Sequence, residues 1–480
     1  MKKLMTRMCV LAAVLLAGGA PARAATIEWT NTSGGIYNTP GNWQGGVLPG
    51  ILDLARFSVA GPFQVSLSGG HTNDALRFDG NSAPITLNLA GYTLYASNAL
   101  YVGYTAGQSP VVVVSNGNLR MERLQLAANS SGGEMTMIDS SNDVSTLGGL
   151  AVGLTGTGLL TMANANTRLN VSGTGAHQLG GSAGGLGTLV ISNGQMNIAG
   201  GLDVGLAGEG VMRVVRGTNL VAGTIVIGRS LGGRGTVIME EPGAEVRGAL
   251  NLALGTGTIG RLYLRGGLYH GDGETKVSEY GEALIVMTGG SLVLTNNPGN
   301  FYLPRYTGTG TLVMAHPDSS ITLQGTSRGF QLGADRGHGE MIMSNGSLRI
   351  WNMQLGTAGA GAYGSLHMYN ATNILTDSGG RALTIGDGGG TTGLLVMADE
   401  RALLRGQEGG TGGGTLLGSA GDGTMILSNG TMYTKGLLLG NAVGARGTVI
   451  IQDARLYVQT NAVSIGNNNG SWGWMSVDHP

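Results

Sequence analysis

One short pattern recurs along most of this 480-residue chain. Two alternating apolar residues precede a glycine, as in Leu202-Asp-Val-Gly205, and a glycine-rich turn and two further apolar pairs follow. We call the residue after the first pair the anchor. Its fifteen copies are Gly103, Ala127, Gly153, Gly180, Gly205, Gly228, Ala253, Ser278, Leu303, Gly333, Gly356, Gly386, Gly418, Gly440 and Gly466. They lie 22 to 32 residues apart, with a mean of 25.9 over 14 intervals, and such a period indicates a solenoid.

Each copy contains three short runs of alternating apolar residues. In the copy over residues 187–205 these are Leu189 and Ile191, Met196 and Ile198, and Leu202 and Val204. Alternation with a period of two is typical of strands that bury one face. Three strands in the same order in every copy predict an all-β fold, a right-handed parallel β-helix of about fifteen coils of roughly 26 residues. We expect these six side chains to point inward and essentially no α-helix.

The composition agrees with strands separated by turns. Glycine makes up 91 of 480 residues without a Gly-X-Y triplet, which excludes collagen, and 41% of the chain is hydrophobic, which excludes disorder. A methionine recurs at one inward position, at Met137, Met162, Met239, Met287, Met314, Met343, Met368 and Met397. Because these positions otherwise hold Leu, Val or Ile, we interpret the methionines as flexible core residues rather than metal ligands.

Residues 1–24 have the three parts of an export signal. Lys2, Lys3 and Arg7 precede an apolar stretch over residues 10–17, and Ala22-Arg-Ala24 forms a small-residue cleavage site. The apolar stretch is much shorter than the roughly 20 residues that span a bilayer. We therefore predict a chain that is exported, that begins at Ala25 after cleavage, and that does not span a membrane.

Cleavage changes the charge and the chemistry of the chain. The remaining 23 Lys and Arg against 28 Asp and Glu give a net charge of −5. A chain with so few cations lacks the basic surface that binds the phosphates of nucleic acid. The only cysteine, Cys9, lies in the removed segment. We expect no disulfide, thiol nucleophile or thiolate metal site in the mature protein.

The two ends differ from the middle. Residues 25–99 follow the period less well and hold three of the five phenylalanines, so we interpret them as an N-terminal cap that grades into irregular first coils. Residues 100–480 are the repeats. They stop at Pro480 after the second strand of a coil, which favours a truncated reading frame whose missing part holds further coils or an anchor.

The running pattern Val-Gly-x-x-Gly-x-Gly-x-Leu-x-Ile, as at Val152–Gly153 and Val204–Gly205, resembles the repeat of autotransporter (type V secretion) passengers and PEP-CTERM-associated surface proteins. The opening Trp29-x-Asn31 with Asn42-Trp43-x-Gly-Gly is similar to the start of many such proteins. The resemblance covers nearly the whole mature chain and implies a β-solenoid at a bacterial surface. It brings no shared catalytic residues. Neither the C-terminal barrel of autotransporters nor a sorting signal is present in this sequence.

Two polar stretches are the candidates for chemistry. Residues 270–282 include His270, Asp272, Glu274, Lys276 and Glu279, and residues 335–340 run Asp-Arg-Gly-His-Gly-Glu. A calcium or sugar site is one interpretation of the first stretch. We favour solvated turns for both, because no acidic cluster occupies the matching turn of a neighbouring coil and calcium needs six to eight converging oxygens.

Other polar and aromatic residues give weaker signals. The tyrosines at positions 92, 95, 101 and 104 are a candidate face for stacking on sugars. His71, His177, His316 and His367 lack metal-ligand spacing. We predict no catalytic, cofactor-binding or metal-binding residues.

Three classes of function fit the repeat. A secreted or cell-surface structural or adhesive rod requires only the solenoid and is the interpretation we favour; its partners would be surface glycans or other cell-surface proteins. A glycan-binding module and a polysaccharide-degrading enzyme, either a lyase or a glycoside hydrolase, remain as alternatives. The fold does not separate them.

Overall fold

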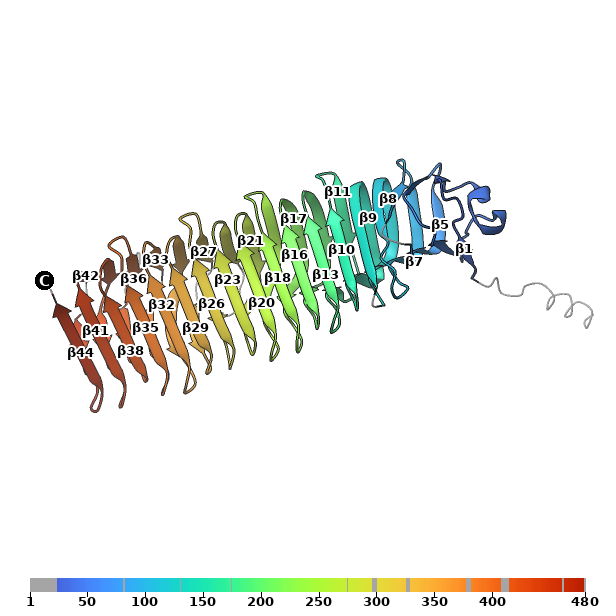
Figure 1. Ribbon diagram of the computed structural model, residues 1–480. Helices are drawn as coiled ribbons and strands as arrows, with labels where there is room; N and C mark the ends of the chain where they lie inside the picture. Colours follow the sequence, from blue (N-terminus) through green and yellow to red (C-terminus); the bar gives the residue numbers. More distant parts are fainter. Residues whose placement is uncertain are drawn as a thin grey trace, which may run out of the picture.

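The computed structural model describes residues 24–80, 83–129, 131–173, 175–273, 275–295, 300–324, 329–376, 381–406, 414–459 and 462–478. The predicted export signal, apart from Ala24, lies outside these residues, as does Glu274. The described chain forms a long rod of parallel strands with its two ends at opposite tips (Figure 1). The parallel β-helix predicted from the repeat is confirmed, with about 17 turns and no α-helix among the described residues.

The strands form three stacked faces. The first face consists of the strands that lead into the anchor position: β1 (Thr26–Glu28), β3 (Leu54–Phe57), β12 (His177–Leu179), β15 (Leu202–Val204), β22 (Lys276–Val277), β25 (Phe301–Leu303), β28 (Gly329–Ala334), β31 (Asn352–Thr357), β34 (Arg381–Ile385), β37 (Gly414–Leu417), β40 (Leu437–Leu439) and β43 (Val463–Ile465).

The second face follows the anchor. Its strands are β2 (Gly35–Ile36), β4 (Phe63–Ser66), β6 (Pro84–Asn88), β10 (Thr157–Met162), β13 (Leu186–Ile191), β16 (Glu209–Val214), β18 (Arg234–Met239), β20 (Ile259–Leu264), β23 (Glu282–Met287), β26 (Thr309–Met314), β29 (His338–Met343), β32 (Tyr363–Met368), β35 (Thr392–Met397), β38 (Asp422–Leu427), β41 (Arg446–Gln452) and β44 (Trp472–Asp478).

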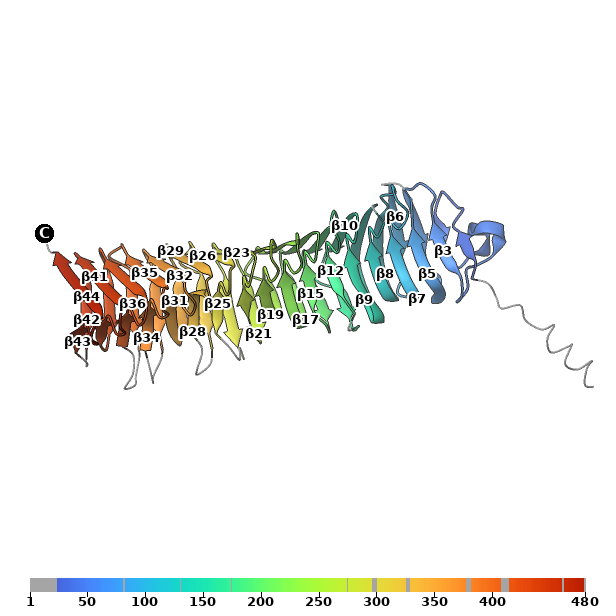
Figure 2. The same ribbon diagram turned by 90° about the horizontal axis from the view of Figure 1, so that it is seen from below.

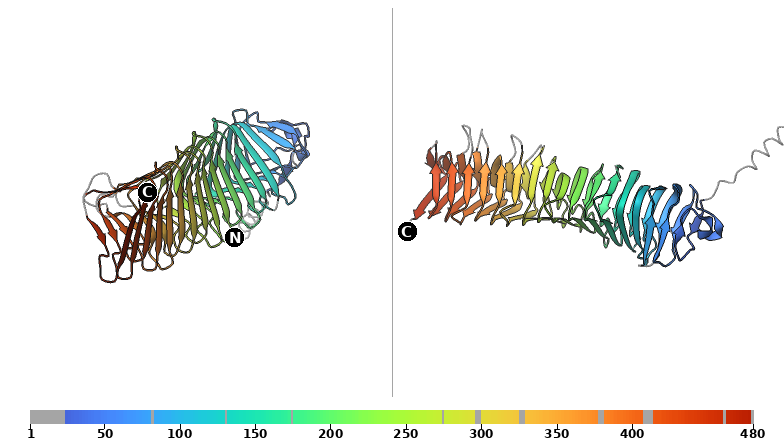
Figure 3. Two further views of the ribbon diagram at one scale, coloured as in Figure 1. Left: turned by 60° about the vertical axis from the view of Figure 1, so that its left-hand side comes forward. Right: turned by 90° about the horizontal axis from the view of Figure 1, so that it is seen from above.

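The third face closes each coil. Its strands are β11 (Thr167–Val171), β14 (Gly194–Ile198), β21 (Leu268–Asp272), β24 (Ser291–Thr295), β27 (Ser320–Leu323), β30 (Ser347–Ile350), β33 (Thr372–Leu375), β36 (Leu403–Gly406), β39 (Thr431–Thr434) and β42 (Arg455–Val458). Some strands bend from one face into the next: β5 (His71–Phe78), β7 (Thr93–Val102), β8 (Val111–Leu126), β9 (Gly132–Val152), β17 (Gly217–Ile227) and β19 (Ala244–Leu252). Figure 2 shows the stacking from a second side, and Figure 3 views the rod obliquely and from above.

The core is a continuous column inside the three faces. All six side chains predicted to point inward in the copy over residues 187–205 are buried, with exposed fractions of 2% or less. The methionine column is also buried: Met137 pairs with Met162 in the next coil, and Met314 pairs with Met343. Neighbouring coils thus bury each other's apolar faces, as the alternation predicts.

The anchor lies where the first face turns into the second. Fourteen of the fifteen predicted anchors have a positive φ, from 50° at Ala253 to 76° at Gly228. At Gly153 the packing explains the preference for glycine, because a Cβ there would lie 2.0 Å from the backbone oxygen of Leu186.

The fifteenth predicted anchor, Leu303, was assigned one residue too early. Leu303 pairs with Leu332, so Pro304 occupies the position of Gly333. Proline has its φ fixed near −65° and cannot adopt the left-handed conformation of the other anchors.

The predicted number of coils was slightly low because the stack begins earlier than residue 100. β1, β3, β5 and β7 already pair in register on the first face. The register places Ser58 and Asp79 in the anchor column of these coils, so the glycine pattern does not mark them.

Aromatic side chains fill the N-terminal end of the core. Trp29 and Trp43 form an isolated antiparallel bridge, and their rings meet edge to face at 5.1 Å. Trp43 also follows η1 (Pro40–Asn42) and precedes η2 (Gln44–Gly46), the two short 3-10 turns outside the first coil. Phe57 stacks on Phe78 of the next coil at 4.8 Å. These large rings cover the end of the apolar column.

Candidate functional site

The corner between the first and second faces has an unusual turn in three neighbouring coils, the last of which has a positive φ at Ala358 (47°) and Gly359 (93°). Seven coils place a glycine with positive φ four residues after the anchor: Gly107, Gly184, Gly232, Gly257, Gly390, Gly444 and Gly470. In the coil that carries Pro304, the positive φ falls instead on Tyr306 (φ 55°). In the next coil it falls on Asp335 (φ 48°) and Arg336 (φ 81°) as well as on the anchor. Bulky residues rarely adopt this conformation, and it often marks functional positions.

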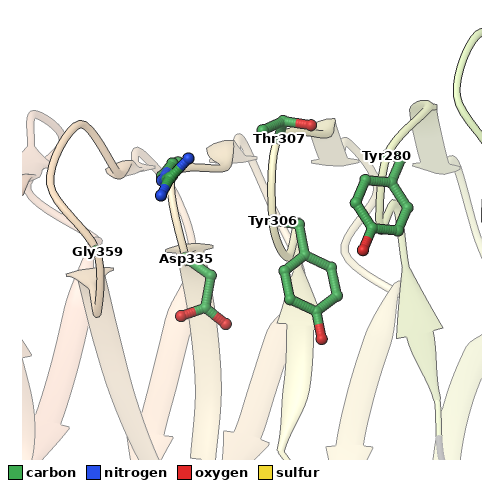
Figure 4. Close-up of a pocket in the computed structure, with 6 residues that line it drawn as sticks. Tyr280, Tyr306, Thr307, Asp335 and Gly359 are labelled. Atoms are coloured by element: carbon green, nitrogen blue, oxygen red, sulfur yellow. The ribbon is translucent and has the colours of Figure 1, made fainter.

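Three side chains at this corner come from equivalent positions of successive coils. Tyr280, Tyr306 and Asp335 each lie two residues after the anchor column. The rings of Tyr280 and Tyr306 are stacked, with centroids 5.0 Å apart and planes 8° apart. Figure 4 shows both rings and the carboxylate of Asp335 projecting to the same side of the row of turns at this corner. The spacing follows from the roughly 4.8 Å separation of parallel strands.

Arg305 links the tyrosine pair to the carboxylate. Its guanidinium carbon lies 4.7 Å from the centroid of the Tyr306 ring and 4.8 Å from that of Tyr302. Its Nε lies 3.3 Å from Oδ2 of Asp335. Partial burial by itself lowers the pKa of Arg305, but the hydrogen bond to Asp335 and the nearby phenols and carboxylate raise it overall. The guanidinium is therefore charged and fixed between an aromatic face and a carboxylate.

These residues border a cavity of about 430 Å³, lined by Tyr280, Tyr306, Thr307, Asp335, Arg336 and Gly359. Arg336 is exposed, and no ion pair holds its guanidinium within the described part of the chain. The charges of Arg305 and Asp335 cancel, so Arg336 gives the cavity a formal net charge of +1. Gly359 has a positive φ of 93°, which residues with a side chain rarely adopt, and a Cβ there would make a close contact of 3.2 Å with Cα of Asp335.

The two polar stretches predicted as solvated turns meet at this cavity. Tyr280 comes from the first stretch, and Asp335 and Arg336 come from the second. Tyr306 and Arg305 lie between the two stretches in the sequence and were not among the predicted candidates. With the predicted anchor Leu303, the column two residues after the anchor reads Tyr280, Arg305 and Asp335. Tyr306 enters this column only when Pro304 is placed at the anchor position.

The remaining polar residues of the two stretches are dispersed. Asp272 accepts a hydrogen bond from Thr295 and lies 3.6 Å from Nε2 of His270. Lys276 pairs with Glu279 at 3.3 Å. Among the described residues, no three His, Cys, Asp or Glu side chains converge as a metal site would require.

The four tyrosines proposed as one stacking face are not brought together as a single platform. Tyr95 lines a second cavity of about 590 Å³, where Arg120 pairs with Asp143 at 3.4 Å. Tyr101 and Tyr104 contact each other edge to face at 4.8 Å, and the guanidinium of Arg77 lies 4.5 Å from the Tyr104 ring. Tyr92 is exposed in a turn.

The histidines have separate structural environments. His71 contacts the backbone oxygen of Pro49 at 2.6 Å. His177 is buried, with an exposed fraction of 1%. His316 lies 3.7 Å from Asp318, and His367 lies in β32.

The chain was compared with known protein families, curated proteins and solved structures. No protein-family model, no curated protein and no solved structure matches it. Within the residues that the structure describes, there is no helix of the length and apolar character needed to cross a bilayer.

Proposed function

We propose that this chain is an exported bacterial protein that forms a rod at the cell surface, where it has a structural or adhesive role. The observation that carries the proposal is the unbroken stack of about 17 parallel turns. At roughly 4.8 Å per turn, this stack is about 80 Å long. Such a rod holds one end far from the other without needing any catalytic group.

The export signal over residues 1–24 and the family resemblance of the repeat support the location. The low number of cations and the net charge of −5 after cleavage argue against nucleic acid as a partner. Surface glycans or other cell-surface proteins are the partners that suit an adhesive rod. The proposal assigns the rod no enzymatic activity.

Export is tested on cells of the native host. We expect the N-terminal residue of the mature protein to be Ala25, and we expect protease added to intact cells to remove the rod while a periplasmic marker stays intact. An uncleaved protein that resists protease until the cells are lysed would contradict the proposal. Adhesion is tested by deleting the gene: loss of attachment to host cells or neighbouring cells is expected, and unchanged attachment leaves a structural role only.

A further inference from the structure

We propose that the corner cavity at Tyr306 and Asp335 binds an acidic saccharide, a sugar unit that carries a carboxylate such as a uronate. The proposal adds a ligand site to the rod and deepens its adhesive role, which rests on the proposed function. The proposed site is this cavity with its immediate surroundings. It comprises the six lining residues given above together with Arg305.

The polar groups of the cavity suit a molecule rich in hydroxyls. The carboxylate of Asp335 accepts hydrogen bonds, the Thr307 and tyrosine hydroxyls both donate and accept, and the guanidinium of Arg336 donates. The tyrosine rings supply apolar contact area with a polar tip, which fits the mixed surface of a pyranose. Binding pockets of this volume usually combine such an apolar wall with a few fixed polar groups.

The charge of the site selects an acidic sugar over a neutral one. Asp335 is neutralised by Arg305, whose Nε lies 3.3 Å from it, whereas Arg336 has no ion-pair partner among the described residues. A guanidinium matches a carboxylate through two parallel hydrogen bonds. One carboxylate per sugar unit fits one unpaired arginine. A dense polyanion such as nucleic acid would place further charges against Asp335.

The geometry is prepared before any ligand arrives. Arg305 is fixed on Tyr306 and Asp335, and the tyrosine rings support each other. The corner also departs from the glycine turn used by seven other coils and places Tyr306, Asp335 and Arg336 in the left-handed region. Three of the non-glycine residues with positive φ thus lie at one cavity, and conformational cost of this kind often marks a binding site.

A second tyrosine stack in the same rod provides a matched control. Tyr433 and Tyr457 stack with centroids 4.8 Å apart, and the guanidinium of Arg405 lies 5.4 Å from the Tyr433 ring. Within the described residues, however, Arg405 has no carboxylate beside it corresponding to Asp335. This stack lies on the third face and not at the corner. It therefore has the aromatic and cationic parts without the acidic one.

The test measures binding of tetrasaccharides to the purified full chain by calorimetry. Tetragalacturonate and an alginate tetrasaccharide are the acidic probes, and methyl-esterified tetragalacturonate is the neutral control. We expect at least one acidic probe to bind. We expect esterification, R336Q and Y306A each to weaken that binding by about tenfold or more, because each removes a charged or stacking contact. Y433A should leave it unchanged.

The result that overturns the proposal is also specific. It fails if neither acidic probe binds at millimolar concentration, if the ester binds as well as the acid, or if R336Q and Y433A behave alike. Because Arg336 is exposed, R336Q tests the site without disturbing the core. Circular dichroism melting verifies that Y306A is folded. Binding by purified protein is independent of export, so failure here and failure of the surface-rod proposal are distinguished.

Discussion

Asn219 lies one coil beyond Met196 in the same buried column of the third face. Both side chains have an exposed fraction of 0%. The amide nitrogen of Asn219 donates to the sulfur of Met212 at 3.7 Å, while its Oδ1 has no hydrogen-bond partner in the described structure. Asn142 and Asn373 occupy the same column and have the same orphaned oxygen. A buried carbonyl without a partner destabilises the fold.

Asn219→Leu is therefore expected to stabilise the rod. Leucine has a similar size and removes the unpaired oxygen, so the free energy of unfolding should rise by about 1–2 kcal/mol. The midpoint of denaturation in guanidinium chloride measures the change. Gln195→Leu, in the strand beneath and exposed, is the control and should change little. A lower midpoint for Asn219→Leu would mean that the weak contact to Met212 outweighs the orphaned oxygen.

His177 is expected to make stability depend on pH. Its Nδ1 accepts a hydrogen bond from the backbone N–H of Leu150 at 3.2 Å, and its Nε2 lies 2.9 Å from the carbonyl oxygen of Gly173. This arrangement requires the neutral ring with the proton on Nε2. Burial lowers the pKa of His177 below its ordinary value of 6.5, although the contact to Gly173 and the charge of Asp203 act in the opposite direction.

The direction in which stability changes with pH follows from the difference in proton binding between the folded and unfolded chain. As the pH falls below 6.5, the unfolded chain binds a proton at His177 before the folded chain does, so stability decreases until the lowered pKa of the folded state is reached. The full contribution is present above pH 6.5. We expect the melting temperature to fall between pH 7.5 and pH 5.5, and to fall less in His177→Gln. Equal pH dependence in the two proteins would assign the effect to other groups.

The periodic part of the fold could be predicted because it depends on local alternation. Leu189 and Ile191 are buried as expected, since every coil repeats the same apolar period. The register failed where a residue of different chemistry takes the anchor position. Leu303 lies 25 residues after Ser278, as the period predicts, but the strand register places Pro304 in the anchor column. Asp79 was missed for the same reason, because a carboxylate replaces the glycine.

The corner site could not be predicted without the exact register. Tyr280, Tyr306 and Asp335 are separated by 26 and 29 residues, so a fixed period does not align them. Each looks like an isolated polar or aromatic residue in its own turn. Their proximity arises only when coils of unequal length are stacked, with the extra residues accommodated in the turns.

Asp79 is expected to stabilise the first coils. Its side chain has an exposed fraction of 1% and accepts hydrogen bonds from Arg56 at 2.9 Å, from Arg77 and from the backbone N–H of Thr105 at 3.0 Å. Asp79→Ala removes the acceptor that these three donors share, while Arg56 keeps its ion pair with Glu28 at 3.0 Å. The loss should be about 2–3 kcal/mol, reduced from the value for a fully buried pair because both arginines reach solvent.

Hydrogen exchange measures the effect of Asp79→Ala locally. Amides of β5 and β7 should exchange faster than in the parent protein, while those of β35 and β38 should not change. Asp399→Ala removes the carboxylate of an exposed pair with Arg401 and is the matched control, with no measurable effect expected. Unchanged exchange in β5 after Asp79→Ala would show that the arginines find other acceptors.

Ile385 and Ile465 occupy the same position, directly before the anchor, in two coils of the first face. Ile385 has an exposed fraction of 0%, whereas Ile465 in the last described coil is 52% exposed.

A coil is stabilised by the neighbours on both sides, so identical substitutions at the two positions should differ in cost. Ile385→Ala should lower the free energy of unfolding by about 2–4 kcal/mol. Ile465→Ala should cost less than about 1 kcal/mol, because little area is buried there. Denaturation midpoints of the two variants measure this difference in cost. Equal losses would mean that the last described coil is covered in solution, for instance by self-association. In that case Ile465→Ala would also lower the mass of the protein measured by sedimentation.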